Sequence, residues 1–417
     1  GVVEGPDRAR YVDCLERMHY IKEPIQALDE DEFIEAYISE LDPHRMYFLE
    51  EDVSAYKERF GPSISKFLKV GHLYPAFLIF ENFRQAARDR TDWVQNRIQG
   101  EFDFNTEFTY APDRSKAEWP KTAEEANDLW DRRIKYEMLN EIISELSRLE
   151  KRAEAAESEE ITEAEKAAAA ESGEAPEAIT DPDSPETYAG ILEEARASLT
   201  KRYDRFAKSL NDIEAPDVQE RFLTTLTNMY DPHSTFLSAD SLEEFAIAMR
   251  NSLVGIGAIL SEEDSYCVIK ELLPGGPAER SKLLNPEDKI VGVGQGKDGQ
   301  MVDTIGMKLR KVVKMIRGKK GSEVRLLIRP ADGDPGERRE IVLVRDEIKL
   351  TANLANAEVF QVPVGDKTVP IGVIDLPAFY GSGDAGRSST TKDVEELIYK
   401  LKALKVEGIV LDLRRNG

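Results

Sequence analysis

The stretch "SLVGIGAILSEEDSYCVIKELLPGGPAERSKLLNPEDKIVGVG" (252–294) decides the fold of the central part of the chain. It alternates short aliphatic runs with glycine and proline, which is typical of short strands joined by tight turns. A short helix is predicted to begin behind Pro277. With the residues that follow, the pattern predicts one compact β-rich module over 251–346, with a second helix at 306–317 and strands at about 254–260, 266–272, 289–294, 323–329 and 339–345.

The segment "VGIGA" (254–258) is the candidate binding loop of this module. Its glycines leave main-chain N–H groups uncovered by side chains, and such groups form a nest for a carboxylate. The strand edge that follows could then accept an extended peptide. The helix "GMKLRKVVKMIRG" (306–318) would form the other wall, and its apolar side carries Leu309, Val312, Val313 and Ile316. A glycine-bearing strand packed in a core is the alternative interpretation.

The last seventy residues predict a β–α–β unit. Strands are expected at 369–379 and 408–413, with a helix at 390–406 between them and a linker before them. Such units have parallel strands in a right-handed crossover, and both faces of a parallel sheet are normally buried. Two strands and one helix cannot bury both faces, so more chain is expected. Because sites lie beyond the carboxyl ends of parallel strands, the "RRNG" tip (414–417) is a second candidate site.

Residues 1–152 are predicted to be helical, because apolar residues recur there at helical spacing, as in "DEFIEAYISELD" (31–42). The acidic, alanine-rich segment 153–187 has little to bury and is expected to be partly disordered. An acidic interaction segment is the alternative. Helices are expected again at 187–210 and 215–230, so residues 188–250 are interpreted as helices flanking the β module.

Composition excludes several classes of function. The net charge of −24 argues against wrapping nucleic acid or docking on an anionic membrane. The two cysteines, Cys14 and Cys267, fit neither a disulfide scaffold nor a zinc site, and we expect no metal and no cofactor. No run reaches the roughly 18 apolar residues of a membrane-spanning helix, and the first residues show no signal-peptide pattern.

Three further patterns are interpreted as structural. "GVGQGKDG" (292–299) is expected to contain a hairpin turn rather than a phosphate loop, because no helix begins directly after it. His44 and His233 lie in similar Asp-Pro-His turns and have no metal-type partner at short spacing. The chain contains four S-x-x-K matches, and none lies at a strand-to-helix elbow, so none is assigned to catalysis.

In order, "DPHSTFLS", "VGIGA", "LPGGPAERSKLLNPEDKIVGVGQ", "VVKMIRGKKGSEVRLLI" and "GVIDLPAFY…VLDLRRNG" resemble the C-terminal processing peptidases, specifically the tail-specific protease branch. "LDPHRMYFLEEDV" (41–53) resembles the N-terminal helical domain of that branch. The resemblance therefore covers nearly the whole chain apart from the acidic insert. It implies a helical N-terminal domain (1–152), an insert (153–187), protease-body helices (188–250), a PDZ domain (251–346) and the start of the α/β protease core (347–417).

The resemblance also implies an activity and a set of site residues. The family cuts proteins after recognising an apolar C-terminus, and it uses a serine nucleophile and a lysine general base. Its carboxylate-binding loop would fall on Gly255, Ile256, Gly257 and Ala258, and Leu309 and Val313 would line the pocket for the substrate's tail. Gly417 would supply an oxyanion-hole amide. The serine and lysine would follow "DLRRNG", so this chain is expected to bind tails and cleave nothing.

Partners and location follow from the same resemblance. The expected partners are protein or peptide C-termini, with an adaptor protein as a further possibility, and the expected location is the periplasm. One position departs from the family pattern: Glu287 stands where a glycine is usual before Asp288 and the "KIV" strand. Glutamate is strained at the positive φ that glycine tolerates, so the departure concerns the local turn and not the domain.

Two alternatives from other classes stay open. A non-catalytic PDZ scaffold would gather proteins by their tails, and sequence without a downstream serine and lysine would favour it. An α/β protein that binds anions or nucleotides is the third alternative, and calorimetry with a nucleotide and with an apolar-ended peptide would separate it from the others.

Overall fold

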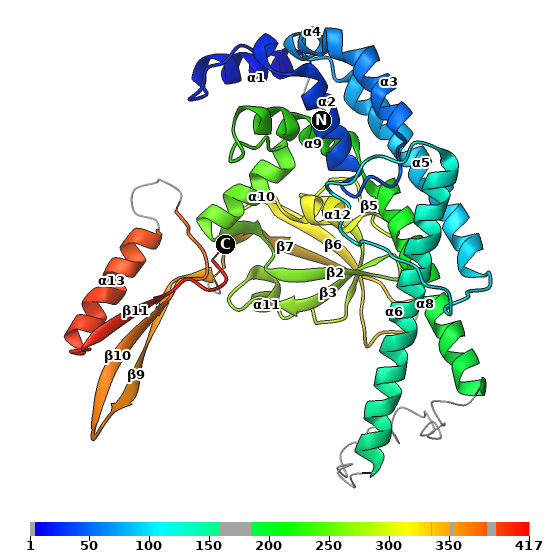
Figure 1. Ribbon diagram of the computed structural model, residues 1–417. Coiled ribbons are helices and arrows are strands. Elements are labelled where there is room, and N and C mark those ends of the chain that lie inside the picture. The colour runs from blue at the N-terminus through cyan, green and yellow to red at the C-terminus, as the bar shows by residue number, and fades with distance from the viewer. Residues whose placement is uncertain (1–4, 158–184, 335, 351–352, 382–388, 417) are drawn as a thin grey trace. The chain divides into compact units, whose positions relative to one another are not determined.

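The computed structural model describes residues 5–157, 185–334, 336–350, 353–381 and 389–416 (Figure 1). The chain divides into two compact units, 1–238 and 239–417. The first is helical, and the second contains the described strands. The predicted fold class is confirmed: a helical N-terminal part, a β module with two helices, and a βαβ unit. The predicted disorder of the acidic insert falls mainly on residues outside the described ranges.

The first unit is a set of helices with two 3-10 turns, at Ile25–Ala27 and Gly61–Ser63, and a long irregular segment, 99–122, between α5 and α6. Helix α8 packs against α5 and α6, and α2 packs against α9. No described helix is both long and apolar enough to cross a membrane. The helices are α1 (Gly5–Met18), α2 (Glu30–Leu41), α3 (Glu50–Phe60), α4 (Ile64–Lys69), α5 (Tyr74–Ile98), α6 (Ala123–Glu157), α8 (Pro185–Asp212) and α9 (Ala215–Tyr230).

Helix α2 shows why these segments fold as the sequence predicts. Its N-cap residue, Asp29, accepts hydrogen bonds from the main-chain N–H groups of Asp31 and Glu32. This satisfies donors that a helix start otherwise leaves unpaired. Its apolar residues recur at helical spacing and are all buried: Phe33, Ile34, Tyr37, Ile38 and Leu41. The helix is therefore specified both by its cap and by its buried face.

The two Asp-Pro-His turns differ in their surroundings. Asp42 is 1% exposed, and its carboxylate accepts hydrogen bonds from the main-chain N–H groups of Met46, Tyr47 and Phe48. Burial raises the pKa of Asp42 above its usual value. Asp231 accepts hydrogen bonds from Ser234, His19 and the N–H of His233, which lower its pKa. His44 and His233, which follow the prolines, lie in turns as predicted, but they are exposed, whereas packed turn residues were expected.

The second unit begins with α10 (Ala239–Arg250) and continues into the β module. The main sheet has the strand order β2-β3-β4-β6-β7, with β5 paired to β4, and a separate antiparallel pair joins β1 to β8. Two helices, α11 (Pro277–Ser281) and α12 (Leu309–Ile316), belong to this module. The strands are β1 (Ser252–Gly255), β2 (Ala258–Glu263), β3 (Tyr266–Leu272), β4 (Lys289–Gln295), β5 (Val302–Asp303), β6 (Glu323–Arg329), β7 (Arg339–Val344) and β8 (Asp346–Lys349).

The strands around 252–294 lie close to their predicted positions, with one difference. The sequence predicts one strand at about 254–260, whereas the structure has two, β1 and β2, separated at Ile256 and Gly257. Gly257 has φ +76°, a conformation that interrupts a strand and favours glycine. The "KDG" turn does join antiparallel strands, because β5 pairs with β4 at Val293↔Val302.

The βαβ unit is present as predicted, with an added strand. Strands β10 (Lys367–Asp375) and β11 (Gly408–Asp412) are parallel, and α13 (Thr390–Ala403) connects them (Figure 1). Residues 356–364, expected to lie in a linker, instead form β9 (Asn356–Val364), antiparallel to β10. Almost every residue of β9 is exposed, although Phe360, Val362 and Val364 alternate with Gln361 and Pro363.

Candidate functional site

In the loop between β1 and β2, two carbonyl groups accept hydrogen bonds, whereas two N–H groups have no hydrogen-bond partner. The Ile256 carbonyl accepts a hydrogen bond from the N–H of Ala278 (2.8 Å), and the Gly257 carbonyl accepts one from Leu273 (2.9 Å). Within the described residues, the N–H groups of Ile256 and Gly257 donate no hydrogen bond. The loop is thus fixed through its acceptors, while its donors are left without a protein partner although Ile256 and Gly257 are buried.

Gly257 is required by the shape of this loop. At φ +76°, a side chain is strained whatever space surrounds it. A methyl group here would also lie 3.0 Å from Gly276 Cα and 3.1 Å from Ile348 Cδ1. Gly255 differs, because a methyl group at that position would meet only ordinary contacts, 3.4 Å from Leu253 Cδ1 and 3.8 Å from Arg317 Cγ. The two glycines of the loop therefore carry different constraints.

The strand after the loop has one open edge. Strand β2 is the terminal strand of its sheet and pairs with β3 on one side only among the described strands. An edge strand presents unpaired N–H and C=O groups to which an extended peptide can add. Helix α12 approaches this same strand. The open edge of β2 and helix α12 are therefore neighbours, which is the arrangement that the predicted groove requires.

The apolar side of α12 divides between the core and a cavity. Val312 and Ile316 are buried in the core of the module. Leu309 and Val313 are half-buried and line a cavity of about 500 Å³. The opposite wall of this cavity comes from α10, through Asp240, Ser241, Glu243 and Glu244. The predicted site residues Leu309 and Val313 therefore share one hollow, and α10, interpreted from sequence only as a flanking helix, borders it.

Arg345 caps the C-terminal end of α12. The sequence analysis did not identify this residue. Its side chain is 3% exposed. The guanidinium donates to the carbonyls of Met315 (3.0 Å) and Ile316 (2.7 Å), the last residues of the helix. Other bonds reach the Glu323 carbonyl and the Gln295 side chain. Burial lowers the pKa of Arg345. Arginine suits the capping of C-terminal carbonyls, which carry the negative end of the helix dipole.

Two ion pairs connect α10 to α12, and these were also missed. Lys314 Nζ lies 2.5 Å from a carboxylate oxygen of Asp240. Arg317, the residue that follows the last turn of α12, pairs with Glu244. The sequence analysis assigned no partner to the basic residues of this helix. The signal that could have found these pairs is the matching acidic spacing Asp240, Glu244 against basic Lys314, Arg317.

Glu287 takes the conformation that its usual glycine would take. Its φ is 68°, its N–H donates to the Ile269 carbonyl (2.6 Å), and its carboxylate accepts from Lys270 Nζ (2.9 Å). The next residue, Asp288, is 2% exposed and accepts hydrogen bonds from the N–H groups of Asn285 and Ala331. The turn keeps its shape in spite of the strained glutamate, because the surrounding hydrogen bonds hold it.

The second candidate site, at the end of β11, is described only as far as Asn416. Arg414 folds back onto Asp412, which lowers the pKa of that carboxylate to about 2. The Asn416 side-chain amide donates to the Leu376 carbonyl (3.0 Å), which follows β10. The tip thus lies across the carboxyl ends of both parallel strands, as the topology predicts. Gly417, the predicted oxyanion-hole residue, lies outside the described residues.

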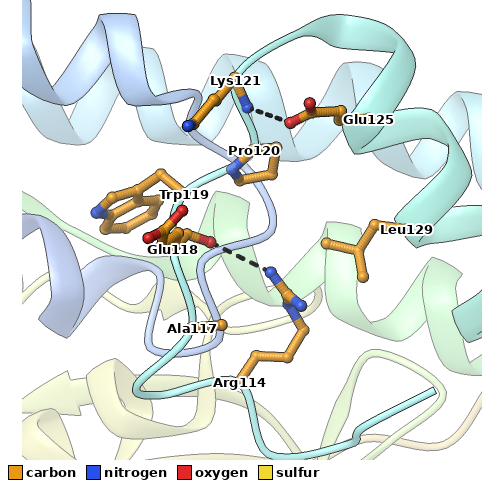
Figure 2. Close-up of a pocket in the computed structure, with 8 residues that line it drawn as sticks. All are labelled: Arg114, Ala117, Glu118, Trp119, Pro120, Lys121, Glu125 and Leu129. Carbon is orange, nitrogen blue, oxygen red and sulfur yellow. Dashed lines mark hydrogen bonds between the residues drawn. The ribbon is translucent and has the colours of Figure 1, made fainter.

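A cavity of about 520 Å³ in the first unit carries none of the predicted site residues (Figure 2). Glu125 accepts a hydrogen bond from the N–H of Lys121 (2.8 Å), and Arg114 donates to the Glu118 carbonyl (3.3 Å). These two hydrogen bonds occupy part of the lining, whereas the buried Trp119 Nε1 and Arg114 Nε have no hydrogen-bond partner among the described residues. In the part of the chain that the structure describes, no group of His, Cys, Asp and Glu side chains could hold a metal ion.

Comparison with known proteins places these features in a family. Residues 11–240 match the family model of the tail specific protease N-terminal domain, and residues 246–329 match that of the PDZ domain. The chain is 32% identical over 403 residues to the tail-specific protease of Haemophilus influenzae, with 97% of this chain and 50% of that protein covered. It is 29% identical over 239 residues to the carboxy-terminal processing protease CtpA of Bacillus subtilis, with 55% of this chain and 46% of that protein covered.

One solved structure is similar to the β module. The PDZ domain of a carboxy-terminal protease from Vibrio cholerae, in complex with peptide, is 45% identical, with a TM-score of 0.23; the match covers 24% of this chain and 99% of that one. The chain spans about half the length of the two curated relatives it matches. Because the N-terminal domain model matches more than half of its residues and a PDZ domain follows directly, the chain belongs to the family of tail-specific, C-terminal processing proteases.

Proposed function

We propose that this chain is the tail-recognising part of a serine endopeptidase, and that it binds apolar protein C-termini in the groove between β2 and α12. The observation that carries the proposal is the loop at Ile256 and Gly257, whose N–H groups are unused beside the open edge of β2. Membership of a C-terminal processing family supports it. The PDZ domain is assigned to 251–346, between the body helices at 188–250 and the α/β core that begins at 347.

A tail would bind by three contacts. Its carboxylate would accept hydrogen bonds from the loop N–H groups, including that of Ala258 at the start of β2. Its main chain would extend the sheet along β2. Its last apolar side chain would enter the hollow lined by Leu309 and Val313, where full burial of an aliphatic side chain contributes about 1.5 to 3 kcal/mol. Selection for a free carboxylate and an apolar end follows from this arrangement.

The proposed chemistry of the whole protein is acyl transfer to a serine, with a lysine as the base. A buried lysine with a lowered pKa can accept the serine proton near neutral pH. Gly417 would donate its N–H to the oxyanion, a contact that contributes about 3 kcal/mol to lowering the barrier. The family resemblance assigns the serine and lysine to sequence after "DLRRNG". The chain of 417 residues is therefore proposed to bind tails without cleaving them.

Fluorescence anisotropy with a labelled ten-residue peptide ending in three apolar residues tests tail recognition. The free acid is expected to bind at least tenfold more tightly than the same peptide with a C-terminal amide, because the amide removes the charge that the loop receives. Equal affinity of the two peptides would exclude the loop as a carboxylate site.

Gly257→Asp and Gly257→Ala separate charge from shape in the loop. Both variants strain the positive φ, but only aspartate brings a negative charge against the peptide carboxylate. We expect both to bind the tail more weakly than the unchanged chain, and the aspartate variant to bind most weakly. If Gly257→Asp bound as tightly as the unchanged chain, the loop would be removed from the site.

Leu309→Ala tests the apolar wall. If the side chain lines the tail pocket, its loss should weaken binding of apolar tails by about 1 to 2 kcal/mol. Leu283→Ala is the matched control, because Leu283 is an exposed leucine of the same module and does not line the cavity. Equal effects of the two substitutions would contradict the proposed pocket.

Incubation of the chain with a tailed protein tests the assignment of catalysis. No cleavage is expected, and hydrolysis blocked by a serine-directed reagent would show that the nucleophile lies within these 417 residues. A longer protein that carries the downstream sequence is expected to cleave. If it bound tails and never cleaved, the scaffold alternative would be favoured.

A periplasmic location, proposed from the family resemblance alone, is tested by fractionation of cells that express the full-length protein. An adaptor protein would be sought in the same fraction.

A further inference from the structure

Helix α10 lies against the residues proposed to receive a tail. On α12, Leu309, Val313 and Arg317 follow one another at intervals of four and so lie on one side of the helix. All three line the 500 Å³ cavity whose other wall is α10. The residues that α10 contributes are polar: Asp240, Ser241, Glu243 and Glu244. Its large apolar residues Leu242 and Phe245 are more than half exposed. The wall that α10 contributes to this cavity is therefore polar, and its partly buried apolar residues Ile247 and Met249 do not line it.

The contact between the helices depends on charge. Arg317 pairs with Glu244, and Lys314 pairs with Asp240. The Arg317 side chain is 23% exposed, whereas those of Lys314 and Asp240 are 60% and 41% exposed. Exposed ion pairs contribute little, while a less exposed partner is screened less by salt. Glu244 itself is 64% exposed, so both pairs are largely exposed, and Arg317 is the least exposed of the four charged side chains.

Arg317 also lies at the carboxylate loop. A methyl group on Gly255, the residue before Ile256, would lie 3.8 Å from Arg317 Cγ. Arg317 follows the last turn of α12, the end that Arg345 fastens. The Arg317 side chain therefore runs from beside Gly255 into the cavity that Leu309 and Val313 line. In the structure, its partner is the side-chain carboxylate of Glu244.

We infer that α10 is an acidic gate over the tail groove, in which Glu244 occupies Arg317 in place of a tail carboxylate. An incoming C-terminus exchanges one carboxylate for another at Arg317 and releases this end of α10. Arg317 is thereby a specificity-determining residue for free C-termini. The inference rests on the proposed function, because it assumes that tails bind along β2. The gate adds an internal ligand, Glu244, that competes with the tail. Competition lowers the affinity of the groove for tails, but the groove still selects a free carboxylate and an apolar end.

The central experiment measures tail binding by the full chain carrying Glu244→Gln. This change removes the internal carboxylate without removing the helix, and Glu244 is 64% exposed, so the fold should tolerate it. Because an exposed ion pair is worth about 0.2 to 1 kcal/mol, we expect the free-acid peptide to bind about 1.4- to fivefold more tightly. Glu243→Gln is the matched control, since Glu243 lines the same cavity but forms no ion pair within the described residues.

A second substitution identifies the group that receives the tail. Arg317→Gln in the Glu244→Gln chain should remove the gain in affinity, because the tail carboxylate loses the guanidinium. Asp240→Gln in the unchanged chain should have a smaller effect than Glu244→Gln, because its partner Lys314 is more exposed. Hydrogen exchange of residues 239–250 should become faster when the unchanged chain is saturated with peptide, as α10 is released.

The outcomes separate the gate from the proposed function. If Glu244→Gln and Glu243→Gln both bind the tail as the unchanged chain does, the gate is wrong and tail recognition stands. A gain that survives Arg317→Gln would likewise overturn the exchange at Arg317. If neither the unchanged chain nor Glu244→Gln binds the free-acid peptide, tail recognition itself fails. Binding by Glu244→Gln alone would show a gate that is fully closed.

Discussion

Strands β4 and β11 are both rich in branched aliphatic residues, yet one is buried and the other is exposed. In β4, Ile290, Val291 and Val293 are at most 4% exposed. In β11, Ile409, Val410 and Leu411 are 43% to 50% exposed. The β module closes its own core with a sheet and two helices, whereas β11 borders a three-stranded sheet on which one helix packs. The sequence of an apolar strand thus indicates how much apolar surface has to be buried. Whether that surface is buried depends on the elements that pack against the strand.

The same difference applies to polar groups. Arg345 in the β module is buried and satisfied by main-chain carbonyls, whereas Arg415 beyond β11 has a 74% exposed side chain and pairs with Asp375. A closed core makes each buried hydrogen bond expensive to remove, because water cannot replace the lost partner. The β module should therefore respond strongly to substitution, and the βαβ unit weakly.

The largest expected effect is the loss of a core side chain. Leu326→Ala removes a residue that is 0% exposed in β6, and we expect about 3 kcal/mol of destabilisation of the β module. Val410→Ala in β11 should cost less than 1 kcal/mol, because half of that side chain already contacts solvent. Hydrogen exchange read by mass spectrometry resolves each unit separately. Equal losses at the two sites would show that β11 is buried in solution.

Arg345→Met is expected to cost about 2 kcal/mol, because it leaves the carbonyls of Met315 and Ile316 without donors in a buried place. The groove helix α12 should exchange its amides faster, and tail binding should weaken together with the stability of the helix. Arg415→Met is the comparison in the βαβ unit, and its effect should stay below 0.5 kcal/mol, as for most exposed ion pairs. A mild Arg345 variant would mean that other contacts hold α12.

Acid should destabilise both regions through one carboxylate in each. Arg280 and Lys320 lower the pKa of Asp346 to about 2, and Arg414 lowers that of Asp412 to about 2. A lowered pKa favours the charged form in the folded state, so the stabilisation is present above pH 4 and is lost as the pH falls towards 2. Asp346→Asn should flatten this loss in the β module only, and Asp412→Asn in the βαβ unit only. Thermal unfolding followed by circular dichroism, together with hydrogen exchange of each unit, measures this loss of stability between pH 5 and pH 2.

The smallest expected effect is a gain at Glu287. Replacing it with glycine relieves a positive φ but loses the contact with Lys270. Relief of the strained conformation is worth about 1 kcal/mol, and exposed pairs contribute less, so the module should become slightly more stable. Denaturation of the Glu287→Gly chain beside the unchanged chain tests this. A clear loss of stability would show that the Lys270 contact outweighs the strain.

Much of the fold could be predicted because the relevant signals are local. Helix α9 begins and ends where the sequence predicts, since Pro216 opens it and Asp231 ends it. The strands of the β module follow from glycine, proline and branched residues. Strand β9 was not predicted, because Pro363 interrupts the alternation of Phe360, Val362 and Val364, and proline is uncommon inside a strand.

In the candidate site, too, the features with a local sequence signal could be predicted, and those that depend on distant residues could not. Loop 254–258 and the apolar side of α12 were identified from sequence, because glycine content and helical spacing are local properties. The division of that side into core residues and cavity residues depends on the sheet packed beneath it. Arg345 was missed because it lies 29 residues from the carbonyl of Ile316 that it holds.

The sequence by itself determined the family, the order of the parts and the loop whose glycine needs a positive φ. These depend on short spacings that any fold must respect. Only the tertiary structure decided that Arg345 fastens the groove helix, that α10 lies against Leu309 and Arg317, and that β11 remains exposed. The reason is physical: burial and ion pairing are made between residues far apart in the chain, and their spacing carries no local signal.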